Sequence, residues 1–207
     1  MKLHGFAISN YYNMVKMVLL EKGMAFEEVL TTPSQESSYL TKSPMGKVPC
    51  LETEQGYLTE TAVIMEYLED LGEGPSLFPD DAFQRARVRE IIHYLEIYIE
   101  LPARELYGDA FFSRPADEEL KARVRKKLER GLQALEQITP DSAYFSAEQL
   151  SYADVFYYFT MTVFARMAKI SLNWDAYNEV PKLRERIERL AQRESVQKIH
   201  ADQKAGA

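Results

Sequence analysis

The sequence has a single cysteine, Cys50, and only three histidines, and none of its hydrophobic runs is long. One cysteine excludes an internal disulfide and a CxxC redox pair. The histidines at positions 4, 93 and 200 lack the spacing of metal ligands, so we expect chemistry without a metal. No stretch of about 18 residues is apolar and free of charge, which argues against a membrane span. The start of the chain lacks the pattern of a secretory signal, and we expect a cytoplasmic protein.

Basic residues are also in short supply. The 25 lysines and arginines are outnumbered by 32 acidic residues, which gives a net charge of −7 with both signs mixed along the chain. Proteins that bind nucleic acid present a basic face to the phosphates, so we expect neither nucleic acid nor a membrane as a partner. The composition is instead 46% hydrophobic over 207 residues, which suits one or two domains with a substantial core.

The N-terminal part of the chain alternates short strand patterns with helical ones. Apolar residues with a helical period follow an N-cap signal at Ser9 and end before Gly23, so a helix joins the first two strands. Strands joined by such a crossover are parallel, and the later pair reads as a hairpin. The predicted strands cover 2–7, 25–30, 48–52 and 56–59, and a second helix covers 61–71.

The rest of the chain is predicted to be entirely helical. The segment 72–81 holds two glycines and two prolines and reads as a linker. We therefore expect an α/β domain at 1–76 and an all-α domain at 84–207. The predicted helices cover 83–106 with a bend near Pro102, 117–138, a buried helix at 152–169, and a last one that starts at Pro181, with 201–207 frayed.

A proline interrupts the apolar run Val48-Pro49-Cys50-Leu51. Proline has no N–H to donate to a sheet, so it belongs at an edge or a turn. If the Val48–Pro49 bond is cis, the backbone N–H and C=O of Val48 point outward and an extended peptide can pair with them. The alternative is a trans proline that ends an ordinary edge strand. Cys50 is expected to be an inert core residue.

Two helix starts carry hydroxyl groups. At the start of the helix at 61–71, backbone N–H groups and the Thr61 hydroxyl can hold a carboxylate, while Glu60 can hold an ammonium group. At the start of the first helix, Ser9 is the best-placed donor for a thiolate, with Asn10, Tyr11 and Tyr12 as rivals. In both places the alternative is simple helix capping.

The start of a third helix carries a capping signal with a structural role. Ser151 and Asp154 have the S-x-x-D spacing of a capping box at the head of the buried helix. This spacing predicts that Asp154 serves folding and has no catalytic role.

Four segments occur in a characteristic order: SNYYNMVKMVLLEKGMAFEEV (9–29), SPMGKVPCLE (43–52), LTETAVIMEYLED (58–70) and LSYADVFYYF (150–159). Together they resemble the cytosolic glutathione transferase family, in its bacterial-type, serine-like class, over nearly the whole chain. The resemblance implies a thioredoxin-like N-terminal domain that binds glutathione. It also implies an all-helical C-terminal domain that forms a pocket for an apolar electrophile.

The resemblance also implies roles for single residues. Val48 would pair its backbone with the cysteinyl unit of glutathione, and Pro49 would be the cis proline. Glu60 and Thr61 would hold the γ-glutamyl head group. Ser9 matches the catalytic hydroxyl of the serine-type classes, and no cysteine lies near it, which argues against the classes that form mixed disulfides.

The match departs from the family pattern in the first helix. Asn13 stands where the pattern S-x-x-x-R-x-V has an arginine, so Asn10 or Tyr11 could contact the thiolate instead. The glycine carboxylate of glutathione usually meets a polar or basic group in the 31–47 loop. Gln35 and Lys47 are the candidates in this chain.

The second substrate is expected between Ser9 and the long helix that starts at 83. Tyr107, Phe111 and Phe112 could form its apolar wall, although each could equally be core packing. The expected function is conjugation of the glutathione thiolate to small apolar electrophiles, as in detoxification, by a homodimer. The alternatives are a glutathione-dependent peroxidase or isomerase, and a non-catalytic interaction protein that keeps the transferase fold.

Overall fold

The computed structural model describes residues 1–147, 149–178 and 180–205. The chain divides into two compact units: Met1–Leu77 together with the segment from Gln192, and Phe78–Ala191. The boundaries expected from the sequence, 1–76 and 84–207, differ from this division at the C-terminal helix. Within the described ranges, no helix combines the length and the apolar character needed to cross a membrane. The same ranges hold no cluster of three or more His, Cys, Asp or Glu side chains suited to a metal ion.

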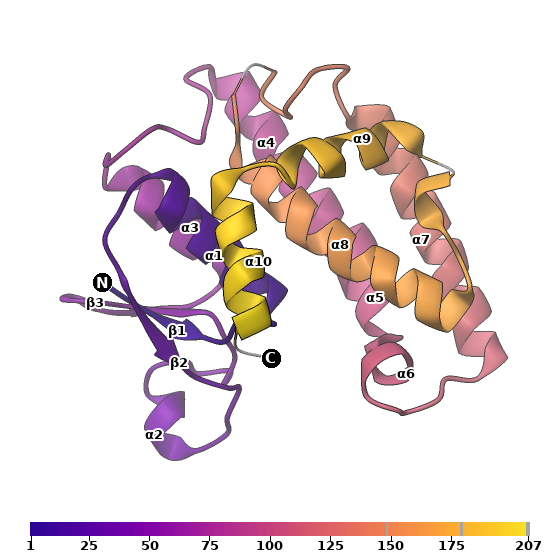
Figure 1. Cartoon of the computed structure of the whole chain (residues 1–207), viewed down its shortest axis with the longest axis horizontal. Coiled ribbons are helices and arrows are strands. Elements are labelled where there is room, and N and C mark those ends of the chain that lie inside the picture. The colour runs from indigo at the N-terminus through magenta and orange to yellow at the C-terminus, as the bar shows by residue number, and fades with distance from the viewer. Residues whose placement is uncertain (148, 179, 206–207) are drawn as a thin grey trace. The chain divides into compact units, whose positions relative to one another are not determined.

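The first unit is built on a four-stranded sheet with the order β2-β1-β3-β4 (Figure 1). Its central strand β1 pairs in parallel with β2 and antiparallel with β3, which continues into β4 through a hairpin. This confirms the predicted crossover and hairpin. The strands are β1 (Lys2–Gly5), β2 (Glu27–Leu30), β3 (Cys50–Thr53) and β4 (Gly56–Leu58).

Two helices of this unit form as the apolar spacing predicts. Helix α1 (Asn10–Glu21) has Ser9 as its N-cap, and the chain leaves it through Gly23, whose φ of +65° suits glycine. It packs against β1 and against α3 (Thr61–Asp70). The short α2 (Ser37–Leu40) lies on the other side of the strands in Figure 1. Because α1 is held in place along its length, the position of its first turn is fixed.

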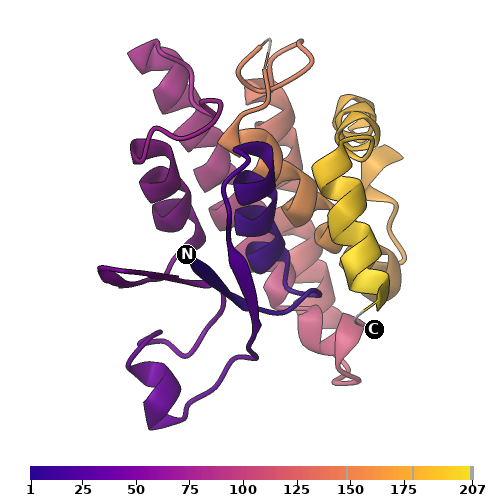
Figure 2. The same ribbon diagram turned by 60° about the vertical axis from the view of Figure 1, so that its left-hand side comes forward.

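The expected frayed tail is wrong for residues 201–205. Helix α10 runs from Glu194 to Ala205 and packs along α1, and the two helices lie side by side in Figures 1 and 2. Val196 and Ile199 are buried, and one turn further along Asp202 accepts a hydrogen bond from Lys16 at 2.7 Å. The helix forms because these contacts fix it to α1. Residues 206 and 207 lie outside the described residues.

The second unit is helical, as predicted. Helix α8 (Tyr152–Leu172) is buried over most of its length and contacts α4, α7 and α9. The elements around it are α4 (Ala82–Tyr94), the π-helical segment η1 (Leu95–Glu100), α5 (Leu101–Arg104), α6 (Tyr107–Phe111), α7 (Glu118–Ile138), the short 3₁₀ segment η2 (Ala176–Asn178) and α9 (Pro181–Leu190).

The expected bend near Pro102 takes the form of a wider helical turn. Pro102 cannot donate to the carbonyl of Tyr98, and its ring would clash with that carbonyl in a regular α-helix. The residues just before it, Leu95–Glu100, are π-helical, which moves that carbonyl out of the way. The long predicted helix therefore consists of α4, η1 and α5.

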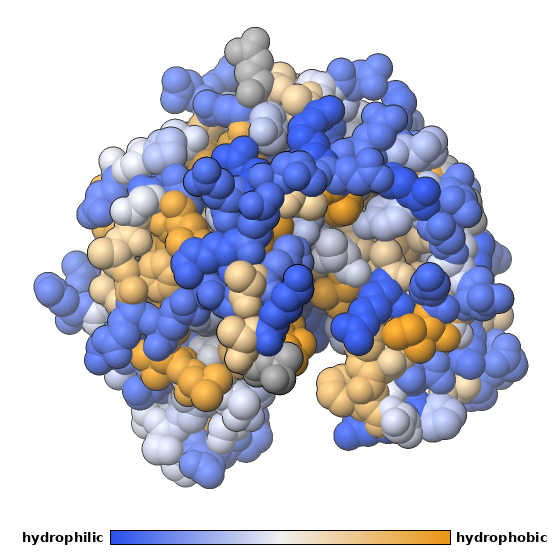
Figure 3. Space-filling model, viewed as in Figure 1, coloured by the Kyte–Doolittle hydropathy of each residue, from blue (hydrophilic) through white to orange (hydrophobic). Residues whose placement is uncertain are grey.

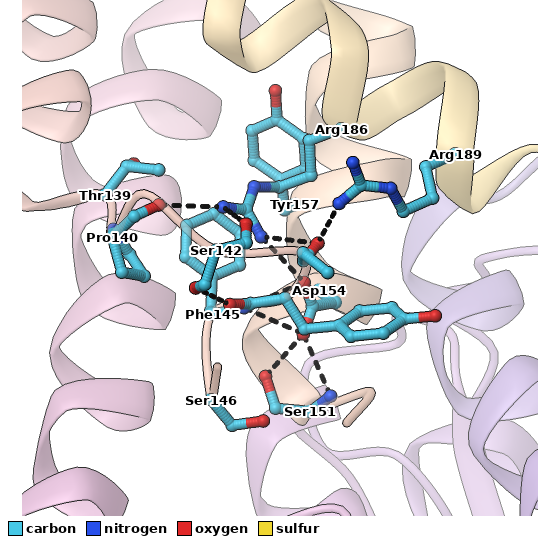
Figure 4. A network of polar contacts seen from close by, with 12 residues as sticks. Thr139, Pro140, Ser142, Phe145, Ser146, Ser151, Asp154, Tyr157, Arg186 and Arg189 are labelled. Atoms are coloured by element: carbon cyan, nitrogen blue, oxygen red, sulfur yellow. Dashed lines mark hydrogen bonds and ion pairs between the residues drawn. The ribbon is translucent and has the colours of Figure 1, made fainter. Parts of the chain in front are cut away.

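The head of α8 forms the predicted capping box (Figure 4). The carboxylate of Asp154 accepts hydrogen bonds from the Ser151 N–H at 2.9 Å and the Ser151 hydroxyl at 2.7 Å. It also accepts one from the Phe145 N–H at 3.2 Å and faces the Arg186 guanidinium at 3.5 Å. Asp154 is fully buried, so it connects a loop and α9 to the start of α8.

Figure 3 shows mostly hydrophilic residues on the outward faces of α9 and α10. Each of these helices has large apolar residues on its inner face: Leu183 and Leu190 of α9 are buried, as are Val196 and Ile199 of α10. Both helices therefore owe their positions to one apolar face each.

Candidate active site

Ser9 lies at the positive end of α1. Its Oγ accepts a hydrogen bond from the Tyr12 N–H at 3.3 Å, and its own N–H donates to the Phe6 carbonyl at 3.0 Å. Within the described parts of the chain, the hydroxyl proton of Ser9 is donated to no acceptor. Ser9 is half-buried, next to an exposed Ile8. The hydroxyl can therefore act as a cap and still donate its proton to an anion placed at the helix start.

The neighbours of Ser9 are more heavily engaged. Asn10 is buried and Tyr11 half-buried, and both make other interactions within the chain. The hydroxyl of Tyr12 donates to the Glu28 carboxylate at 2.5 Å, and burial, reinforced by Glu28, raises the pKa of Tyr12. Tyr12 is thus committed to Glu28, while Asn10 and Tyr11 stay the alternatives to Ser9.

The turn before Ser9 is held by Asn13. Its side-chain amide donates to the Ala7 carbonyl at 2.7 Å, and the residue is almost completely buried. Asn13 stands where the family pattern has an arginine, and here it ties the first turn of α1 back to the loop that carries Ser9. This contact could not be predicted from the sequence, because the type of residue at position 13 does not indicate which carbonyl its side chain reaches.

The Val48–Pro49 peptide bond is cis, as the resemblance implied. The preceding carbonyl, of Lys47, accepts hydrogen bonds from the Tyr39 and Ser43 hydroxyls, each at 2.8 Å. Neither the N–H nor the C=O of Val48 has a hydrogen-bond partner in 1–147, 149–178 or 180–205, and Val48 is half-buried. Its main chain is therefore available to an extended peptide.

Glu60 and Thr61 stand at the start of α3. Glu60 has a φ of +67° although it is not a glycine, it is exposed, and its side chain does not cap the helix. Such a conformation costs about 1–3 kcal/mol and tends to occur at ligand sites. Thr61 is buried, and its hydroxyl has no partner among the residues that the structure describes. The uncapped N–H groups, this hydroxyl and the exposed carboxylate together suit a group that bears both charges.

The two candidates for the glycine carboxylate lie in the loop before Val48. Gln35 and Lys47 are both exposed, and the Gln35 amide donates to the Met45 carbonyl at 3.3 Å. Gly46 keeps this loop tight: it has a φ of +63°, and a Cβ there would lie 2.1 Å from the Ser34 carbonyl oxygen. The Lys47 ammonium has no acidic partner in the described ranges, so of the two it is the more open cation.

Cys50 is fully buried, and its thiol points to the Lys42 carbonyl at 3.6 Å. Burial raises the pKa of this thiol to about 11, so it stays protonated at neutral pH. These findings agree with an inert core cysteine.

The aromatic residues expected to line a second pocket are only partly together. Tyr107 and Phe111 of α6 pack edge to face with ring centroids 5.2 Å apart, whereas Phe112 is 64% exposed. The Tyr107 hydroxyl donates to the buried carboxylate of Glu100, which also accepts from Arg104 at 2.9 Å. The Tyr107 ring is therefore fixed by a polar anchor that the sequence did not indicate.

Comparison with known proteins matches both parts of the chain to one family. A model of the glutathione S-transferase N-terminal domain matches residues 3–76, and a model of the C-terminal domain matches residues 95–191. A glutathione S-transferase from Pseudomonas putida is 40% identical over 205 residues, which cover 99% of this chain and 93% of the relative. The chain belongs to the glutathione S-transferase family. The expected family and the expected activity, that of a glutathione transferase, are thereby confirmed, while the serine-like class stays a prediction.

Solved structures give the same fold for this transferase. Poplar glutathione transferase F1, as a mutant, has a TM-score of 0.83 at 21% identity and covers 99% of this chain and 98% of its own. A maleylacetoacetate isomerase from Methylobacterium, with bound malonate and glutathione, has a TM-score of 0.79 at 21% identity, with 97% and 96% covered. The predicted thioredoxin-like domain followed by an all-α domain is confirmed.

Proposed function

We propose that this transferase binds glutathione along Val48 and joins its thiolate to small apolar electrophiles, with the Ser9 hydroxyl donating a hydrogen bond to the thiolate. The observation that carries the proposal is the unpaired main chain of Val48 beside the sheet. A peptide amide and carbonyl in antiparallel orientation match that pair of groups. The cysteinyl unit of glutathione offers both.

The rest of the tripeptide fits the charges around it. The γ-glutamyl carboxylate accepts from the N–H groups at the start of α3 and from the Thr61 hydroxyl, while Glu60 takes its ammonium group. The glycine carboxylate, at the other end, meets Lys47 or Gln35. These contacts orient the cysteine thiol, and orientation lowers the barrier of the reaction that follows.

Ser9 supports the chemical step. A thiol with a pKa near 8.5 is mostly protonated at neutral pH, and lowering that pKa by about two units takes about 2.7 kcal/mol. A charge-assisted hydrogen bond from Ser9 together with the dipole of α1 can supply this. The thiol proton leaves to solvent, the sulfur forms a bond to the electrophilic carbon, and a leaving group departs with its electron pair.

The proposal also covers the site of the electrophile and the location and assembly of the protein. Tyr107, Phe111 and Phe112 contribute an apolar wall for the electrophile, which suits a small apolar compound. The protein acts in the cytoplasm as a homodimer and serves detoxification.

Titration of the folded protein with glutathione in a calorimeter tests the binding step. We expect saturable heat at millimolar glutathione or below, and turnover of a generic aryl halide by the same preparation. Absence of both heat and saturation would overturn the proposed function, whatever the fold.

Replacing Thr61 by valine should weaken glutathione binding. The change keeps the shape of the side chain and removes a hydroxyl that donates to a carboxylate, a bond worth about 1.5–3 kcal/mol. We expect the dissociation constant for glutathione to rise about tenfold or more. Thr53→Val is the matched control, because the Thr53 hydroxyl donates to the Gly56 carbonyl within the β3–β4 hairpin. Equal affinities of the Thr61→Val variant and the unchanged protein would remove Thr61 from the site.

A further inference from the structure

The C-terminal helix reaches the loop that carries Ser9. The side-chain amide of Gln203 in α10 donates to the Ala7 carbonyl at 3.0 Å, the same oxygen that accepts from Asn13 at 2.7 Å. A carbonyl oxygen has two lone pairs, and the two amides occupy both. Ala7 and Gln203 are 196 positions apart in the sequence. Their hydrogen bond lies two residues before Ser9, which carries the proposed catalytic hydroxyl.

The Gln203 amide is itself oriented. Its oxygen is 2.9 Å from Nδ1 of His200, one turn earlier in α10. Because an amide oxygen only accepts, the ring nitrogen is the donor, and the amide nitrogen is left to face Ala7. The contact is therefore a directed hydrogen bond within a short chain of groups from His200 to Ala7.

Other contacts fix α10 to α1 independently of Gln203. Near the C-terminal end of α1, Glu21 accepts two hydrogen bonds from Arg193, at 2.7 and 2.8 Å, and one from Ser195 at 2.5 Å. In the middle, the buried Lys16 ammonium donates to Asp202 at 2.7 Å. The hydrogen bond from Lys16 lowers the pKa of Asp202, so this carboxylate is charged at neutral pH. Loss of the Gln203 amide alone would therefore leave the helix docked.

We propose that Gln203 is a positioning residue for Ser9, which makes the C-terminal helix part of the active-site machinery. The inference rests on the proposed function of Ser9. The Ala7 carbonyl fixes the loop from Phe6 to Ser9, and two amides hold it more firmly than one. Small displacements of a donor from a reacting atom lower rates strongly, so the loop need move only slightly for turnover to fall.

The test compares the same substitution at two positions of α10. Gln203→Met keeps the length of the side chain and removes the amide, in a residue type that suits a helix. Gln197→Met is the matched control, since Gln197 is exposed on the same helix. Three properties are measured: the pKa of the thiol of bound glutathione, from the ultraviolet absorbance of its thiolate; the dissociation constant for glutathione; and the turnover of an aryl halide.

For Gln203→Met we expect the pKa of the bound thiol to rise and kcat to fall about tenfold, while the dissociation constant changes less than about twofold. Gln197→Met should match the unchanged protein in all three. A role in stability alone would lower the thermal midpoint without moving the thiol pKa. An unaltered thiol pKa and kcat in Gln203→Met would overturn the proposal.

A measurement without glutathione separates this inference from the proposed function. Amide hydrogen exchange of residues 6–13 in the ligand-free protein should be faster in Gln203→Met than in Gln197→Met, because the loop loses one of its two anchors. If exchange increases but the unchanged protein binds no glutathione, the proposed function fails while the loop contact stands. If exchange is equal in both variants, the positioning role fails. Should Gln203→Met not fold, Gln203→Ala is measured in the same way.

Discussion

Ser9→Ala is expected to lower kcat for an aryl halide about a hundredfold, while glutathione still binds. The Ser9 hydroxyl donates its proton to no acceptor in the described ranges, and it stands at the positive end of α1. Removing one preorganised donor from a developing or resident anion typically costs a factor of about 10²–10³ in kcat. The contacts of the tripeptide with Val48 and α3 are untouched, so the dissociation constant should change little.

The pH dependence of turnover should change in a definite direction when the Ser9 hydroxyl is removed. In the unchanged protein the bound thiol has a lowered pKa, and activity rises with pH through that value. Without the hydroxyl the thiol pKa returns toward its ordinary value, so the pH of half-maximal kcat should move up by about one to two units. Kinetics over a range of pH and thiolate absorbance should report the same shift.

Two controls separate the hydroxyl from the cap. Ser9 also caps α1, so Ser9→Ala should cost about 1 kcal/mol of stability. Asp117→Ala removes the N-cap of α7, whose carboxylate accepts from the Leu120 N–H at 2.7 Å, and should lower stability without moving the thiol pKa. Ser9→Thr keeps both a hydroxyl and a cap and should retain most activity. Unchanged turnover in Ser9→Ala would move the role to Asn10 or Tyr11.

The elements that the sequence predicted well depend on short-range signals. The start of α1 at Ser9, its end near Gly23 and the capping box at Ser151 are each set by residues within a few positions. The hairpin of β3 and β4 is set by its turn residues in the same way. The family motifs that indicated a glutathione site are such local segments, which is why the family could be recognised from the sequence.

The features that could not be predicted from the sequence depend on partners far away in the chain or on the conformation of the backbone at single residues. Residues 201–205 have no apolar stripe of their own, and α10 is helical there because Lys16 and Ala7 provide partners. The positive φ of Glu60 and the π-helical turn before Pro102 are details of the backbone conformation. The spacing of apolar residues in a sequence carries no information on distant contacts or on single backbone angles. The hydrogen bonds that hold the loop before Ser9 could therefore not be predicted from the sequence.

The largest loss of stability is expected from Asp154→Ala. Burial raises the pKa of Asp154, and hydrogen bonds from Ser151 together with the charge of Arg186 offset this in part. The truncation would leave the N–H groups of Ser151 and Phe145 without their acceptor, and the buried Arg186 guanidinium without its counter-charge. Removing one partner of a buried pair costs about 3–5 kcal/mol. A protein of this size should then lose about 10 °C or more in its thermal midpoint.

The matched control is Asp141→Ala, in the loop before α8. Its carboxylate is 88% exposed and pairs only with Lys182 at 3.0 Å among the described residues, so its loss should cost well under about 1 kcal/mol. At temperatures below its lowered midpoint, the Asp154→Ala variant should show the same pKa for the thiol of bound glutathione as the unchanged protein. The reason is that Asp154 stabilises the start of α8 and does not act on the sulfur. A thermal midpoint equal to that of Asp141→Ala would show that the network of Figure 4 contributes little to folding. A shifted thiol pKa in a folded Asp154→Ala protein would instead connect the head of α8 to the chemistry at Ser9.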